Sequence, residues 1–168
     1  MLKGQDVVVL LKLLDSDESI PVRDLAHELG FDVAGTHRAL RRLGDAGLYS
    51  AGRKRVLRAP AEEFLVHAVK FSFPAQWGSE VRGVPTAWAA APLKDALMES
   101  DELPPVWPYS KGEVRGLGLE PLHPMVPEAA LADPDLAQRL ALVDALRSSN
   151  SSRLVNLAEG LLKDSIGS

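Results

Sequence analysis

Proline is distributed very unevenly along the 168 residues, and this distribution restricts the fold more than any other feature. Ten of the twelve prolines and all three tryptophans lie between residues 74 and 134. Proline lacks an amide donor and has a fixed torsion angle, so this segment should consist mostly of loops, extended segments and short strands. One brief helix around residues 93–99 is the expected exception. Regular helices are therefore expected mainly before and after this segment.

The first 59 residues have the periodicity of short helices separated by turns. A broad apolar stripe over residues 7–14 predicts a largely buried helix, and a second helix should begin near Pro21 and end at Gly30. Asp32 can cap a third helix, which should place Thr36, Ala39, Leu40 and Leu43 on its inner side. The letters "LYS" and "RVL" alternate around "AGRK", which predicts a small β-hairpin after the third helix.

Helical patterns return after residue 59 and again near the C-terminus. Residues 60–73 should form a linker helix with Pro60 at its first position, and two amphipathic helices are predicted at 134–147 and 151–165. The expected fold class is α+β, mainly α. We predict an N-terminal domain at 1–59, the linker at 60–73 and a module for a partner, an effector or dimerisation at 74–168.

Residues 36–58 form a concentrated basic strip in a chain that is acidic overall. The strip contains seven arginines and lysines and one aspartate, for a local charge of +6, whereas the whole chain has a net charge of −4. A local positive field attracts polyanions even on an acidic protein. The alternative interpretation is that the strip is only a solvent-exposed basic face of a helix.

The stretch "LAHELGFDVAGTHRALRRLGDAGLY" and the order of the elements around it resemble winged helix-turn-helix bacterial regulators of the MarR and ArsR type. The residues that carry the resemblance are Leu25, Ala26, Gly30, Asp32, Leu40 and Leu43. The resemblance covers about the first 60 residues and implies that the third helix enters the DNA major groove while the basic hairpin, or wing, touches the backbone or the minor groove. Gly35 and Thr36 depart from it, because the family usually has a small polar residue followed by an aliphatic one there.

Helical periodicity selects the side chains that should face DNA. With Thr36, Leu40 and Leu43 turned inward, the outer face of the third helix carries Ala34, His37, Arg38 and Arg41, with Arg42 beside it. The hairpin adds Arg53, Lys54, Arg55 and Arg58. Arginine can read guanine or hold a phosphate, so two or three of these groups should specify sequence and the rest should supply salt-dependent affinity.

The proline- and tryptophan-rich segment is expected to hold either an effector pocket or a protein docking face. Arg82, Trp107 and Arg115 are its candidate residues, since aromatic side chains with a few polar groups suit both kinds of site. Trp77 and Trp88 are predicted to fill the core instead.

No pattern in the sequence indicates catalysis, a metal or a cofactor. The absence of cysteine excludes disulfides, thiolate nucleophiles and cysteine-ligated zinc. The four histidines are at least ten residues apart, and Pro121 argues against a helical Glu120–His123 metal pair. The glycines of "GSEVRGVP" and "RGLGLEP" are interpreted as turns, since no phosphate-binding loop surrounds them. We therefore expect a protein that is not an enzyme.

The predicted function is that of a sequence-specific transcription regulator that binds double-stranded DNA, with a dimeric repressor as the expected form. The C-terminal helices could provide the dimer interface, or they could pack inside one chain. The alternative function is a protein-interaction adaptor or an antitoxin-like autoregulator whose residues 74–168 bind a protein partner. We expect a cytoplasmic location without membrane contact, because "VVVLLKLL" is interrupted by Lys12 and followed by acidic residues.

Overall fold

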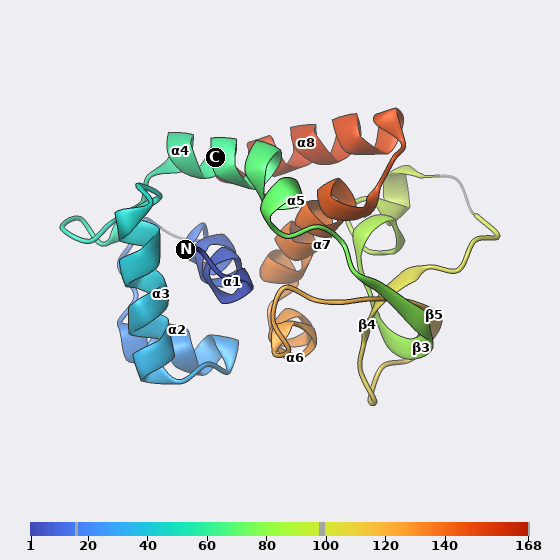
Figure 1. Cartoon of the computed structure of the whole chain (residues 1–168), viewed down its shortest axis with the longest axis horizontal. Helices are drawn as coiled ribbons and strands as arrows, with labels where there is room; N and C mark the ends of the chain where they lie inside the picture. Colours follow the sequence, from blue (N-terminus) through green and yellow to red (C-terminus); the bar gives the residue numbers. More distant parts are fainter. Residues whose placement is uncertain (16, 98–99, 168) are drawn as a thin grey trace.

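The first part of the chain contains three helices and a short hairpin in the predicted order. The computed structural model describes residues 1–15, 17–97 and 100–167. The elements are α1 (Gly4–Leu13), α2 (Val22–Leu29), α3 (Val33–Asp45), β1 (Tyr49–Ser50) and β2 (Arg55–Val56). Figure 1 shows α2 and α3 at one end of the molecule, with the β1–β2 hairpin projecting beside α3.

Helix α1 lies at the centre of the fold. Its residues Val7–Leu11 are five consecutive fully buried side chains, because α1 packs against α3 on one side and α7 on another. A helix that is buried almost all round needs apolar residues on every side, which explains the run "VVVLL".

One interrupted helix connects the hairpin to the rest of the chain. It consists of α4 (Arg58–Glu63), a π-helical turn η1 (Phe64–Ala68) and α5 (Val69–Ser72). It begins two residues before Pro60, the predicted first position, and Pro60 therefore occupies its third position. As a result Arg58 belongs to this helix and not to the hairpin.

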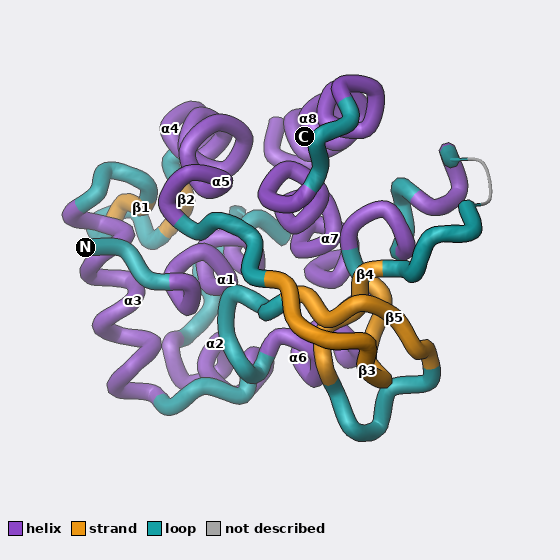
Figure 2. Tube along the Cα trace, turned by 45° about the vertical axis from the view of Figure 1, so that its right-hand side comes forward, coloured by secondary structure: helices purple, strands orange, loops and turns teal. Residues whose placement is uncertain are grey.

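The proline-rich segment forms three strands that close on one another. They are β3 (Trp77–Pro85), β4 (Pro105–Pro108) and β5 (Val114–Leu119). The long strand β3 pairs antiparallel with β4 through its last residues and with β5 through most of its length, while β4 and β5 are parallel. Figure 2 shows these strands grouped on one side of the helices.

Glycines inside the strands allow β3, β4 and β5 to close on one another. The interpretation of the glycines in "GSEVRGVP" and "RGLGLEP" as turns was therefore wrong. A Cβ on Gly83 would lie 2.0 Å from the Trp107 carbonyl oxygen, and one on Gly116 would lie 2.1 Å from the Pro104 carbonyl oxygen. Both glycines lie inside strands, so their role is to let neighbouring backbones approach closely.

The helices of this segment differ from the expectation. Of the helix expected at 93–99, the structure describes a 3₁₀ turn, η3 (Lys94–Ala96), while residues 98–99 lie outside the described residues. A further 3₁₀ turn, η2 (Ala87–Ala89), and helix α6 (Val126–Ala132) were not predicted. Pro127 lies in the first turn of α6, where a missing amide donor costs no hydrogen bond, so proline there is compatible with a helix.

Two of the three tryptophans have the opposite environment from the predicted one. Trp107, a candidate partner residue, is 1% exposed, and Trp77, expected in the core, is 47% exposed. Trp88 is partly buried against the core as predicted. The burial of Trp107 has a chemical cause, because its indole N–H has a buried acceptor: Nε1 donates to Asp144 Oδ2 at 2.7 Å.

Asp144 is the centre of a buried hydrogen-bond network. Besides Trp107, Thr86 Oγ1 donates to its carboxylate at 2.8 Å and Arg147 Nη1 donates at 2.6 Å. Arg147 Nε also donates to the Phe73 carbonyl at 2.7 Å. The network therefore connects α7 with strand β4, with the residue before η2 and with the end of α5.

The C-terminal helices form the predicted hairpin, with bounds close to those expected. They are α7 (Pro134–Ser148) and α8 (Ser152–Gly167). The inner residues of α8, Leu154, Ala158, Leu162 and Ile166, are buried within the chain, and α7 is buried over most of its length. Of the two alternatives for these helices, the structure shows the one in which they pack inside a single chain.

The fold is mainly α with a small β component, as predicted. One hydrophobic cluster extends from α1 to α8 and includes Trp107 of β4. Within the described residues, no helix combines the length and the apolarity that crossing a membrane requires. The division into domains at residues 59 and 73 stays a prediction.

An ion pair connects α1 with the start of α7. Lys12 Nζ donates to Asp133 Oδ2 at 2.6 Å, and Asp133 Oδ1 caps α7 by accepting from the Leu136 amide. Burial raises the pKa of Asp133, but the hydrogen bond from Lys12 and the other favourable contacts outweigh it and hold the pKa below its ordinary value of 3.8. The stability that this depressed pKa contributes is present above pH 3.8 and is lost as the pH falls through the folded pKa.

We predict that Asp133→Asn will lower the free energy of unfolding by about 1 kcal/mol at pH 7, because asparagine keeps the cap but removes the charge that faces Lys12. The difference from the wild type should shrink as the pH falls below about 3.8 and through the lower folded pKa, because Asp133 is neutral in both states only below the folded pKa. Urea unfolding at a series of pH values measures it. Asp135→Asn, in the same helical turn but exposed, is the control. If the difference in unfolding free energy between Asp133→Asn and the wild type did not depend on pH, the stabilisation could not come from the charge of Asp133.

Candidate nucleic-acid interface

The start of α3 is defined by Asp32, Gly35 and Thr36. Asp32 Oδ2 accepts from the Gly35 amide at 3.2 Å, and Thr36 Oγ1 donates to the Asp32 carbonyl at 2.9 Å. A Cβ on Gly35 would lie 2.5 Å from Asp32 Oδ1 and 3.3 Å from Gln5 Nε2. The two residues that depart from the resemblance therefore fit this chain, since glycine leaves room for the cap and the buried threonine satisfies its own hydroxyl.

The outer face of α3 contains the predicted residues. Ala34, His37, Arg38 and Arg41 are exposed, while Thr36, Ala39 and Leu43 are buried and Leu40 is partly buried. Val33 is 43% exposed at the first position of the helix and was not predicted as part of this face. Its position directly after the cap could have indicated this, since first-turn side chains often project from a helix end.

Arg42 differs from its neighbour Arg41. Its Nε and Nη2 atoms donate to Asp6 Oδ2 and Oδ1 at 2.7 and 2.8 Å, and Asp6 is fully buried. The hydrogen bonds that Arg42 donates to Asp6 raise the pKa of Arg42, and the paired guanidinium connects α3 to the start of α1. Arg42 was predicted as a DNA contact, but in the structure its guanidinium is used to position α3.

The hairpin exposes three basic side chains at its tip and second strand. Arg53, Lys54 and Arg55 are exposed, and the Arg53 amide donates to Ser50 Oγ at 3.1 Å. Lys54 has a φ of 55°, so the tip turns through the left-handed region. The hairpin is therefore a two-residue ladder with a basic tip beside α3 (Figure 1).

Arg58, predicted with the hairpin, is occupied elsewhere. Its Nη1 donates to the Ile166 carbonyl at 2.7 Å, and its Nη2 donates to Asp17 Oδ1 at 2.9 Å. The hydrogen bond from Arg58 is the main reason why the pKa of Asp17 is lowered, and the charge of Arg55 adds a smaller effect. Arg58 thus connects the exit of the hairpin with the end of α8.

Internal pairing divides the basic strip into two groups. Arg42 and Arg58 form ion pairs, whereas no ion pair with a described residue is found for Arg38, Arg41, Arg53, Lys54 or Arg55. The five side chains of the second group belong to two adjacent elements, α3 and the hairpin. Their charges are available to an external polyanion.

The predicted partner residues do not form one site. Arg82 and Arg115 are exposed and lie opposite each other on β3 and β5, and Arg115 Nε contacts Glu80 Oε1 at 3.1 Å. Trp107 is buried in the core and offers no docking surface. The described residues contain no group of three or more side chains arranged for a metal ion.

A family model described as winged helix-turn-helix DNA-binding matches residues 9–48. The match covers the second half of α1, all of α2 and α3, and the turn that follows, and it supports DNA as the partner of this segment. It does not favour the MarR or the ArsR type. No curated protein and no solved structure gives a significant match to the chain.

We predict that Arg42→Ala will lower the free energy of unfolding by about 2–3 kcal/mol, because it leaves the buried Asp6 carboxylate without its charged partner. The adjacent Arg41→Ala should change it by less than about 0.5 kcal/mol. Denaturant unfolding of the two variants tests this directly. Equal stabilities would mean that the Asp6–Arg42 pair does not hold α3 in place.

Proposed function

We propose that the protein is a sequence-specific DNA-binding transcription regulator, in which α3 enters the major groove and the β1–β2 hairpin contacts the DNA backbone. The main support for this proposal is that the basic residues of the strip fall into two groups, one with internal ion pairs and one without them among the described residues. Five basic side chains on two adjacent elements are exposed without internal ion pairs, whereas Arg42 and Arg58 hold these elements in place.

The chemistry of each element suits a different part of DNA. Arg38 and Arg41 on the outer face of α3 can pair with guanine O6 and N7 or with a phosphate, and Val33 can contact a thymine methyl group. Arg53, Lys54 and Arg55 lie on a short, exposed hairpin, from which their side chains can reach successive phosphates of the DNA backbone.

The remaining charge of the protein favours one orientation on DNA. Residues 59–168 contain nine basic and fifteen acidic side chains, for a net charge of −6, and residues 1–35 contain three and seven, for −4. Phosphates are repelled by these regions and attracted by the strip. The protein should therefore approach DNA with α3 and the hairpin first.

A homodimeric repressor is the form that we propose, because two half-sites multiply affinity and selectivity. The buried faces of α7 and α8 are not available to such a dimer. The dimer would need a different surface of the molecule.

We predict that the double variant Arg38→Ala, Arg41→Ala will lose at least about tenfold in affinity for a duplex selected from a random library, since each base contact contributes about 1–3 kcal/mol. Fluorescence anisotropy over a salt series measures the affinity. Arg153→Ala is the matched control, because Arg153 is exposed at the start of α8, away from α3 (Figure 1). Unchanged affinity and salt slope in the double variant would show that α3 is not the recognition helix.

The triple variant Arg53→Ala, Lys54→Ala, Arg55→Ala should behave differently. We expect it to weaken binding to selected and unselected duplexes by the same factor and to reduce the salt slope by about 2–3, as three lost phosphate contacts require. A changed preference between the duplexes, with an unaltered slope, would assign the hairpin to base reading instead.

A further inference from the structure

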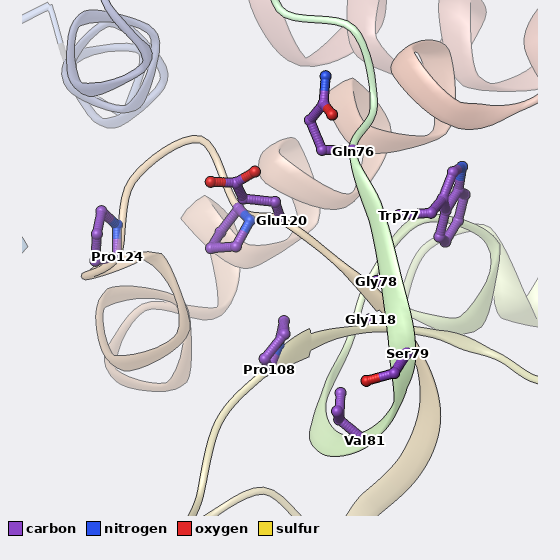
Figure 3. Close-up of a pocket in the computed structure, with 10 residues that line it drawn as sticks. Gln76, Trp77, Gly78, Ser79, Val81, Pro108, Gly118, Glu120 and Pro124 are labelled. Atoms are coloured by element: carbon purple, nitrogen blue, oxygen red, sulfur yellow. The ribbon is translucent and has the colours of Figure 1, made fainter.

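A pocket with a distinct chemical character lies beside the point where the register between β3 and β5 shifts. Its volume is about 600 Å³, within the range of small-molecule sites. It extends from Gln76, directly before β3, past Pro108 at the end of β4, to Pro124 in the segment before α6. Figure 3 shows Ser79, Val81 and Pro108 on the same side of β3 as Glu120 and Pro124, while the Trp77 ring lies on the other side of the strand.

A β-bulge forms one wall of this pocket. The register changes between Trp77↔Leu119 and Glu80↔Leu117, so that two residues, Gly78 and Ser79, lie opposite Gly118 alone. The space beside Gly78 is open, since a Cβ there would have no neighbour closer than 3.9 Å, whereas a Cβ on Gly118 would lie 3.2 Å from the Ser79 carbonyl oxygen. Bulges of this kind often re-aim a side chain next to a binding site.

The lining indicates the charge of the ligand. Glu120 is the one ionisable side chain among the lining residues, and no ion pair joins it to any residue that the structure describes. Gln76 and Ser79 add neutral polar groups, and Val81, Pro108 and Pro121 add apolar surface. An anion would be repelled by the carboxylate, whereas a cation with an apolar body would satisfy both parts of the lining.

The same segment that carries Glu120 also contacts the helix-turn-helix. The Phe31 and His123 rings are 4.5 Å apart, and a Cβ on Gly30 would lie 2.7 Å from Met125 Cε. A Cβ on Gly4 would lie 2.0 Å from the Leu122 carbonyl oxygen. Residues 122–125 therefore pack tightly against the start of α1 and the turn between α2 and α3.

We propose that this pocket binds a small organic cation with an apolar body, that the ammonium group pairs with Glu120, and that residues 120–125 transmit its presence to the α2–α3 turn. The ligand enters between the bulge and the proline-lined segment. Any shift of that segment acts on Gly30 and Phe31, directly before the cap of α3. The site and its connection to the turn do not depend on the proposed DNA-binding function.

Calorimetry on the full chain without DNA tests the ligand class. Three probes share one phenyl body and differ in charge: 2-phenylethylammonium, 2-phenylethanol and 3-phenylpropanoate. We expect the cation to bind tightest, and Glu120→Gln to weaken it about tenfold while leaving the neutral probe unchanged. Glu113→Gln, an exposed carboxylate at the turn before β5, is the control and should bind as the wild type does. Equal affinities for the three probes, no binding of the cation, or a Glu120→Gln variant with wild-type affinity would overturn the site.

Amide hydrogen exchange tests the transmission. Saturation with 2-phenylethylammonium should change exchange at residues 29–33 and leave the hairpin tip at 51–54 unchanged. Met125→Ala should keep the affinity for the cation but reduce the change at the turn, because it removes the side chain that contacts Gly30. Unchanged exchange at the turn in the wild type, with the pocket occupied, would overturn the transmission.

Discussion

The buried carboxylate of Asp144 is the interaction on which the second half of the structure depends. A charge in the core is costly unless several hydrogen bonds compensate for it, and Thr86, Trp107 and Arg147 supply these bonds. Because the three donors come from separate elements, the carboxylate determines where the closed strands lie on α7. The Arg147 bond to the Phe73 carbonyl also determines where the chain leaves α5 and enters β3.

A comparable principle operates in the first half, where internal ion pairs decide which basic side chains remain at the surface. Asp6 pairs with Arg42 and thereby holds α3 against α1. Arg58 is held by two acceptors, the Asp17 carboxylate and the Ile166 carbonyl. The basic groups left over are on the outer side of α3 and on the hairpin. Adjacent arginines thus have different environments, most clearly Arg41, which is exposed, and Arg42, which is paired with Asp6.

Contacts between the two halves give the helix-turn-helix a defined position. Lys12 pairs with Asp133, Arg139 bonds to Asp15 and to the Leu11 carbonyl, and residues 122–125 pack against the α2–α3 turn. A single hydrophobic cluster continues from α1 through α7 to α8. A change at the proline-lined pocket therefore has a short physical route to α3.

Much of the fold could be predicted from local patterns, because caps, periodicity and proline act over a few residues. Asp32 and Gly30 marked the helix boundaries, the stripe over residues 7–14 marked α1, and the outer face of α3 followed from helical spacing. The pairing of strands β3, β4 and β5 could not be predicted in the same way, since the glycines inside β3 and β5 resemble turns until their close backbone neighbours are known.

The sequence by itself determined the order of the N-terminal helices and the C-terminal helical hairpin, the location of the basic strip and the exclusion of cysteine chemistry, since these follow from residue types and their spacing. Only the tertiary structure decided that Trp107 is buried while Trp77 is exposed, that Arg42 and Arg58 are internal partners, and that Glu120 faces a pocket. The physical reason is that each of these outcomes depends on a partner distant in sequence, such as Asp144 for Trp107 and Asp6 for Arg42. No local pattern contains that information.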